Sequence, residues 1–86
     1  MKRTPVESSD VKSIGFERTN DIADFALRGS RGTLEIEFHR NGVYRYESVS
    51  EADYNAVMRS ESIGKALHAI VKTKGYAYSK VVEISN

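Results

Sequence analysis

The chain has 86 residues, a length that suits one domain with a modest hydrophobic core, and we expect a single domain over residues 1–86. Its 13 basic and 12 acidic residues give a net charge of +1, so any basic patch that could bind nucleic acid or a membrane must be local. The sequence contains no cysteine, which excludes disulfides and thiol catalysis. It also contains no apolar run of about 20 residues that could span a membrane, so we expect a cytoplasmic protein.

The first part of the sequence predicts strands and turns. A short strand is expected at Ser13 to Glu17, where Gly15 indicates a close backbone approach or a bulge. Arg18 to Asp21 is typical of a turn, and Asp21 to Arg28 follows a period of two, which favours a half-buried second strand. Gly29 to Gly32 then predicts a hairpin loop, so this part is expected to be an antiparallel meander.

The strongest signal is a β-hairpin over Gly32 to Tyr46, where two alternating runs are joined by an Asn-Gly turn. A three-residue loop at Arg40 to Gly42 keeps the large apolar side chains on one face, because a two-residue loop would pair them with charged residues. The resulting register pairs Phe38 with Tyr44 and Ile36 with Tyr46.

After the hairpin the period changes and predicts two helices. Ser50 is the expected N-cap of a first, short helix, with Asp53 at its third position. A second helix is expected from about Ile63, because apolar residues recur there at spacings of three and four. Gly75 is expected to end this helix as a left-handed C-cap.

These elements together predict an α+β domain, with an antiparallel sheet of three to five strands packed by two short helices on one face. The sheet is expected to be a meander with a central Asn-Gly hairpin, whose tyrosines point toward the helices. The predicted segments are an N-terminal tail at 1–7, strands at 8–48, two helices at 50–74 and a C-terminal strand or tail at 76–84.

Two tyrosines of the hairpin allow two interpretations. Tyr44 and Tyr46 stand two residues apart on one strand, so both rings point to one face of the sheet. The rings could stack on the bases of a single nucleic-acid strand. Alternatively, they pack against Ile36 and Phe38 as core beneath the helices.

The start of the second helix also allows two interpretations. Ser62, Gly64 and Lys65 lie where free backbone N–H groups and the helix dipole favour a phosphate. The alternative is an ordinary helix cap, with the serine satisfying N–H groups and the glycine allowing close packing. The segment is not a P-loop, because the upstream glycine and the strand that would lead into it are absent.

Lysines without acidic neighbours mark the segment from Ser62 to Val82. Lys65, His68 and Lys72 share one helical face, which gives a local basic stripe on a chain that is neutral overall. The stripe is either a contact surface for a phosphate-bearing partner or an ordinary solvated face. The lysines of this segment are Lys65, Lys72, Lys74 and Lys80.

No catalytic or metal site is predicted, and no cofactor. Glu35, Glu37 and His39 alternate on the solvent side of a strand, without the further converging ligand that a metal site needs. His39 and His68 lie on different elements, with no nucleophile-base-acid signature around either. We therefore expect a protein that is not an enzyme.

Several of these motifs resemble the KTSC domain, a short module named after the C-terminus of some lysyl-tRNA synthetases and also found as stand-alone bacterial and phage proteins. The resemblance covers most of Ser8 to Val71 and implies a small α+β domain with a suspected role in RNA binding and no named catalytic residue. The sequence differs from the family pattern by an insertion around Ile22 to Gly32 and by Ala66-Leu67-His68, where an aromatic pair and a polar residue are expected. The matching motifs are Ser8-Ser9, Ile14-Gly15-Phe16, Leu34-x-Ile36-x-Phe38, Gly42 to Tyr46, and Ser62 to Lys65 leading to Ile70.

The function expected from these patterns is a small binding module for RNA. The alternative is a homo-oligomer, joined through edge strands, that binds a phosphate-bearing small molecule or a partner protein in a groove between subunits. The residues expected to contact nucleic acid or phosphate are Ser62, Gly64, Lys65, Lys72, Lys74, Arg45, Tyr76 and Tyr78.

Overall fold

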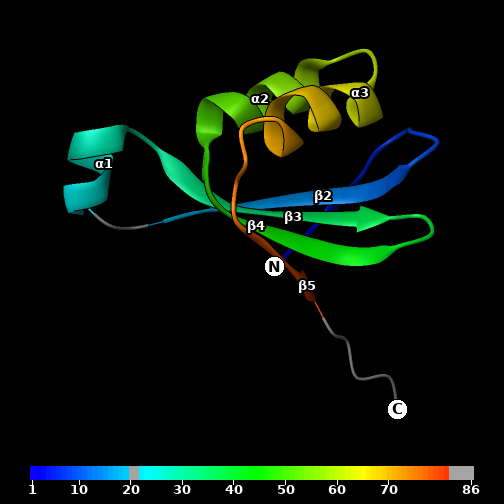
Figure 1. The fold of residues 1–86 in the computed structure, drawn as a ribbon, viewed down its shortest axis with the longest axis horizontal. Helices are drawn as coiled ribbons and strands as arrows, with labels where there is room; N and C mark the ends of the chain where they lie inside the picture. The colour runs from blue at the N-terminus through cyan, green and yellow to red at the C-terminus, as the bar shows by residue number, and fades with distance from the viewer. Residues whose placement is uncertain (20–21, 82–86) are drawn as a thin grey trace.

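The structure is a computed structural model that describes residues 1–19 and 22–81. Its elements are, in chain order, β1 (Thr4–Pro5), β2 (Val11–Arg18), α1 (Ile22–Arg28), β3 (Arg31–Phe38), β4 (Gly42–Ser50), α2 (Glu51–Arg59), α3 (Ile63–Leu67), the π-helix η1 (His68–Lys72) and β5 (Tyr78–Val81). Within the described residues the five strands form one antiparallel sheet in the order β1-β2-β3-β4-β5. Helices α2 and α3 lie together on one face of this sheet (Figure 1), as predicted.

The central hairpin is formed by β3 and β4, as predicted, but its register differs from the prediction by two residues. Ile36 pairs with Tyr44 and Phe38 with Gly42, so the loop is His39 to Asn41. Gly42 adopts a positive φ of 86°, which suits a glycine at the end of a tight loop. A shift of two residues keeps every side chain on its predicted face, so the face assignment is correct although the pairing is wrong.

Residues Ile22–Arg28 form helix α1, and the predicted half-buried strand in this segment is wrong. Over seven residues a period of two is hard to separate from a helical period, and alanine and leucine in this segment favour a helix. Gly29 then has a positive φ of 77° and its N–H donates to the carbonyl of Phe25 at 2.8 Å, so it ends a helix instead of opening a hairpin loop. The predicted turn at Arg18 to Asp21 lies partly outside the described residues.

Gly15 confirms the predicted close approach between backbones. A Cβ at this position would lie 2.7 Å from the carbonyl oxygen of Lys2, just before β1. Strand β2 runs from Val11 to Arg18, longer than the predicted Ser13 to Glu17, and β1 pairs with it inside the segment expected to be a tail.

The core lies between the sheet and the helices. Alternate residues of β3 and β4 point toward α2, α3 and η1, and apolar side chains of these helices pack against them. Burial of this kind contributes about 25 cal/mol per Å² of apolar surface. The buried apolar cluster comprises Val11, Ile14, Leu34, Ile36, Tyr46, Val49, Val57, Ile63, Leu67 and Val71.

The helix boundaries follow the predicted capping residues. Ser50 caps α2, and its Oγ accepts from the backbone N–H of Asp53 at 3.1 Å. The second predicted helix begins at Ile63 as expected, continues as η1, and is followed by Gly75 with a positive φ of 70°. No helix among the described residues is long and apolar enough to cross a membrane. The end of the predicted C-terminal strand, residues 82–84, lies outside the described residues.

Candidate functional site

Strands β4 and β5 bring three tyrosines to the helix side of the sheet. Tyr46 lies opposite Tyr78, and Tyr44 lies opposite Lys80. Helix α2 packs over β3 and β4, whereas β5 forms the edge of the sheet beyond it. As a result Tyr46 is 4% exposed and belongs to the core, Tyr44 is half-buried, and Tyr78 is 63% exposed.

These rings line a hollow of about 520 Å³, which we call the aromatic groove. The Tyr78 ring lies 5.5 Å from the ring of Tyr46 and 6.1 Å from that of Tyr44, between ring centroids. Phe38, at the end of β3, meets Tyr44 edge-on at 5.7 Å. The groove is defined here by Phe38, Tyr44, Tyr46, Tyr76 and Tyr78, with Lys72 at its rim.

Two lysines lie over aromatic rings of this groove. The Nζ of Lys72 is 5.7 Å from the centroid of the Phe38 ring, and the Nζ of Lys80 is 6.0 Å from that of Tyr44. Neither lysine forms an ion pair with a carboxylate in the described part of the chain. Both positive charges therefore remain available to an anionic ligand that enters the groove.

A second hollow of about 390 Å³ adjoins the aromatic groove, and we call it the basic hollow. Lys65, His68 and Lys72 line it together, so the predicted basic stripe is one surface. Phe38 and Lys72 line both hollows, which places the aromatic and basic surfaces side by side. Asp10 also lines the basic hollow and is the acidic residue among the described residues that line it.

The start of α3 is poorly suited to hold a phosphate with its backbone. Helix α3 has only five residues, and its N-cap Ser62 makes no capping hydrogen bond through its side chain. A Cβ built on Gly64 would lie 3.4 Å from an oxygen of Asp10, so a carboxylate already faces this turn. A phosphate at the helix start would meet the like charge of Asp10, so the backbone N–H groups there are poorly placed to bind it. The side chain of Lys65 can still bind an anion in the basic hollow.

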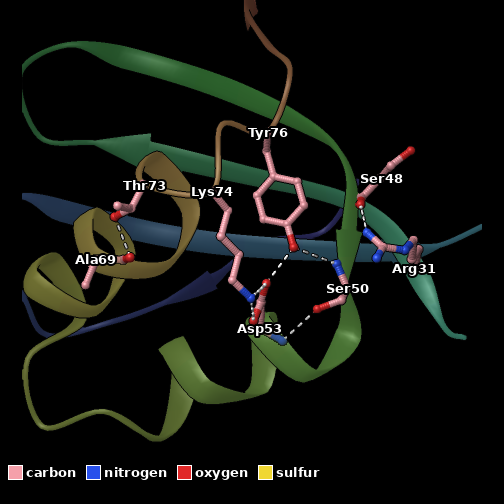
Figure 2. A network of polar contacts seen from close by, with 8 residues as sticks. All are labelled: Arg31, Ser48, Ser50, Asp53, Ala69, Thr73, Lys74 and Tyr76. Atoms are coloured by element: carbon pink, nitrogen blue, oxygen red, sulfur yellow. Dashed lines mark hydrogen bonds and ion pairs between the residues drawn. The ribbon is translucent and has the colours of Figure 1, made fainter. Parts of the chain in front are cut away.

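Lys74 and Tyr76, both expected to contact nucleic acid, are instead hydrogen-bonded to a carboxylate of α2 (Figure 2). The Nζ of Lys74 lies 2.9 and 2.8 Å from the two carboxylate oxygens of Asp53, and the hydroxyl of Tyr76 donates to the same carboxylate. The backbone N–H of Ser50 donates to the Tyr76 hydroxyl at 3.4 Å. This network ties the loop before β5 to the start of α2 and leaves the Tyr76 ring as a wall of the groove.

The network also determines the charges of its members. Burial alone would raise the pKa of Asp53, but the hydrogen bonds from Lys74 and Tyr76 outweigh burial and hold the pKa below its ordinary value. The hydrogen bond to Asp53 raises the pKa of Lys74. The charge of Lys74 is therefore compensated within the fold, and sequence reasoning missed this because the partner lies 21 residues away on another helix.

Arg45 lies on the sheet face opposite the helices and takes no part in either hollow. Its guanidinium binds the carboxylate of Glu35 at 2.8 Å, and Arg3 binds the same carboxylate. Burial would raise the pKa of Glu35, but the hydrogen bonds from Arg45 and Arg3 lower it below its ordinary value. The expected contact residues thus divide between two faces. On the helix side, Lys65, Lys72 and Tyr78 line the two hollows and their side chains make no ion pair or hydrogen bond within the part of the chain that the structure describes.

Comparison with known proteins agrees with this fold. A protein from Stutzerimonas stutzeri (strain A1501), described as uncharacterized, is 28% identical over 81 residues, which cover 94% of this chain and 99% of the relative. The crystal structure of a KTSC domain protein from Yersinia pestis superposes with a TM-score of 0.77 at 28% identity and covers 94% of this chain and 97% of that chain. The sequence pattern of the KTSC domain matches residues 7–78. The chain therefore belongs to the KTSC domain family.

Proposed function

We propose that this domain is a non-enzymatic binding module for RNA, and that it binds through the joined surface of the aromatic groove and the basic hollow. The observation that carries the proposal is the position of Lys72, whose ammonium lies over Phe38 and lines both hollows without a carboxylate partner in the described chain. Aromatic rings interleaved with unpaired cations are the combination that proteins use to bind a nucleic-acid strand.

The charge distribution supports a local binding surface on a chain whose net charge is only +1. Lys65, Lys72 and Lys80 lie on the helix side of the sheet, whereas Glu35 and Glu37 lie on the opposite face and are bound there by Arg45 and Ser13. A polyanion therefore meets lysines without acidic partners in the described chain on the helix side, whereas the cation Arg45 on the opposite face is bound to Glu35. Binding driven by these cations must weaken with salt, because each neutralised phosphate releases a counterion.

The alternative of a ligand site between subunits rests on size, since a chain of 86 residues can hardly enclose a ligand of about 300 Å³ or more by itself. The aromatic groove alone measures about 520 Å³ within one chain, so a subunit boundary is not required to form a site of ligand size. Oligomerisation through the edge strand β5 stays a prediction that light scattering would test.

The proposal is tested by titrating labelled RNA at two salt concentrations, with Lys72→Ala and Lys12→Ala as a matched pair of variants. Lys12 lines a hollow with Ser13 and Glu37 on the helix-free face. Lys12→Ala therefore removes one positive charge from the face that is not proposed to bind RNA. For a single strand, Lys72→Ala should reduce the slope of log K against log salt by about 0.7, and Lys12→Ala should leave it unchanged. No RNA binding at low salt, or equal effects of the two variants, would contradict the proposal.

A further inference from the structure

The aromatic groove provides a feature that phosphate binding alone does not need, namely an exposed ring on an open strand edge. Tyr78 is 63% exposed, although it is one of the large apolar side chains of a small domain. Its neighbours Tyr44 and Tyr46 contact the ring at centroid distances of 6.1 and 5.5 Å, with tilted planes. Most of the side chain is left exposed to solvent.

This arrangement fits a flat, uncharged ligand group of about the same size as the ring. Aromatic rings prefer offset or tilted neighbours, and the rings of Phe38 and Tyr44 already contact each other at 78°. A base that stacks on Tyr78 would therefore extend a cluster already present in the groove. Lys72, over Phe38, and Lys80, over Tyr44, would then neutralise the phosphates that flank that base.

We infer that the ligand is a single strand, and that Tyr78 is the platform on which one of its bases stacks. The inference rests on the proposed function and specifies it, because bases in a duplex are paired and stacked with one another and cannot enter the groove. A duplex would present only its phosphates to the lysines. The groove thus selects unpaired nucleic acid, while the lysines supply affinity without regard to sequence.

Tyr78 can be changed without disturbing the fold, because its side chain is exposed and its hydroxyl makes no hydrogen bond in the described chain. Tyr78→Ala should weaken binding of a short unstructured oligonucleotide by about 5- to 150-fold, the range that base stacking on an aromatic side chain supplies. The salt slope should stay at the parental value, because no cation is lost. Tyr78→Phe keeps the ring and should bind within about twofold of the parent.

The decisive probe is an abasic strand of equal length, which keeps the phosphates and lacks the bases. The parent should bind the abasic strand as weakly as Tyr78→Ala binds the normal strand, and should bind a duplex less tightly than the single strand. The chain has five tyrosines and no tryptophan, so quenching of tyrosine emission by the normal strand, but not by the abasic one, gives a second readout.

The outcomes separate this inference from the proposed function. Equal affinity for normal and abasic strands, parental binding by Tyr78→Ala, or preference for the duplex would overturn base stacking and leave salt-dependent RNA binding intact. Absence of binding to every strand at low salt would overturn the proposed function and the stacking platform with it.

Discussion

The hydrogen bond between Tyr76 and Asp53 allows a prediction whose size follows from the structure. The side chain of Asp53 is 13% exposed and accepts from the Tyr76 hydroxyl at the start of α2. Hydrogen bonds to charged groups contribute about 1.5–3 kcal/mol. Tyr76→Phe keeps the ring and removes this bond, so we expect a loss of about 2 kcal/mol. In a domain of this size each kcal/mol lowers the melting temperature by about 4–8 °C, which gives a decrease of about 8–16 °C.

Thermal unfolding followed by circular dichroism measures this change. Tyr78→Phe is the matched control, because it removes a tyrosine hydroxyl that makes no hydrogen bond in the described chain, and it should melt within about 4 °C of the parent. The double variant Tyr76→Phe with Asp53→Asn should lose less than the sum of the two single losses, since both changes break one interaction. A Tyr76→Phe protein that melts with the parent would refute the structural role assigned to the network.

Three further outcomes follow from the fold. The pKa of Asp53 is lowered in the folded state, so the ionised carboxylate stabilises the fold above the unfolded pKa of about 3.9, and this stabilisation is lost as the pH falls through the lower folded pKa. Below about pH 4, the melting temperature of Asp53→Asn should therefore decline less than that of the parent. Gly15→Ala would place a methyl group 2.7 Å from the carbonyl oxygen of Lys2 and should lower the free energy of unfolding by about 1–3 kcal/mol, seen as a lower urea midpoint. An unchanged midpoint would show that β1 moves aside without cost. Phe25→Ser, on α1, removes a ring that is 62% exposed and should change stability by no more than about 0.5 kcal/mol in the same assay.

Much of the fold could be predicted because local patterns agree with the tertiary structure. The β3–β4 hairpin, the cap at Ser50 and the left-handed Gly75 each depend on a few neighbouring residues. The hairpin register was wrong because pairings that differ by two residues bury the same face, and only the loop geometry distinguishes them. Helix α1 was missed because its seven residues fit both periods, and its apolar side chains Ile22, Phe25 and Leu27 are exposed, so burial does not mark one face of the segment.

The candidate site was only partly predictable, because charges acquire their roles from partners on other elements. Lys72 and Lys74 are equivalent in sequence, yet Lys74 is bound by Asp53, whereas Lys72 lies over Phe38 and has no carboxylate partner among the described residues. Arg45 is next to Tyr44 and Tyr46 in sequence, but alternation along β4 sends it to the opposite face. The alternation of Tyr76, Tyr78 and Lys80 indicated a strand, but the aromatic groove could not be predicted without knowing that this strand pairs with β4.

An amide chemical-shift titration with a short unstructured RNA tests the central claim most directly, because it locates the bound surface residue by residue. The account predicts salt-sensitive shifts at Phe38, Lys72 and Tyr78, around the aromatic groove and the basic hollow, and stationary signals at Glu35 and Arg45 on the helix-free face. Shifts centred on Glu35 and Arg45, or a spectrum unchanged by excess RNA at low salt, would contradict it.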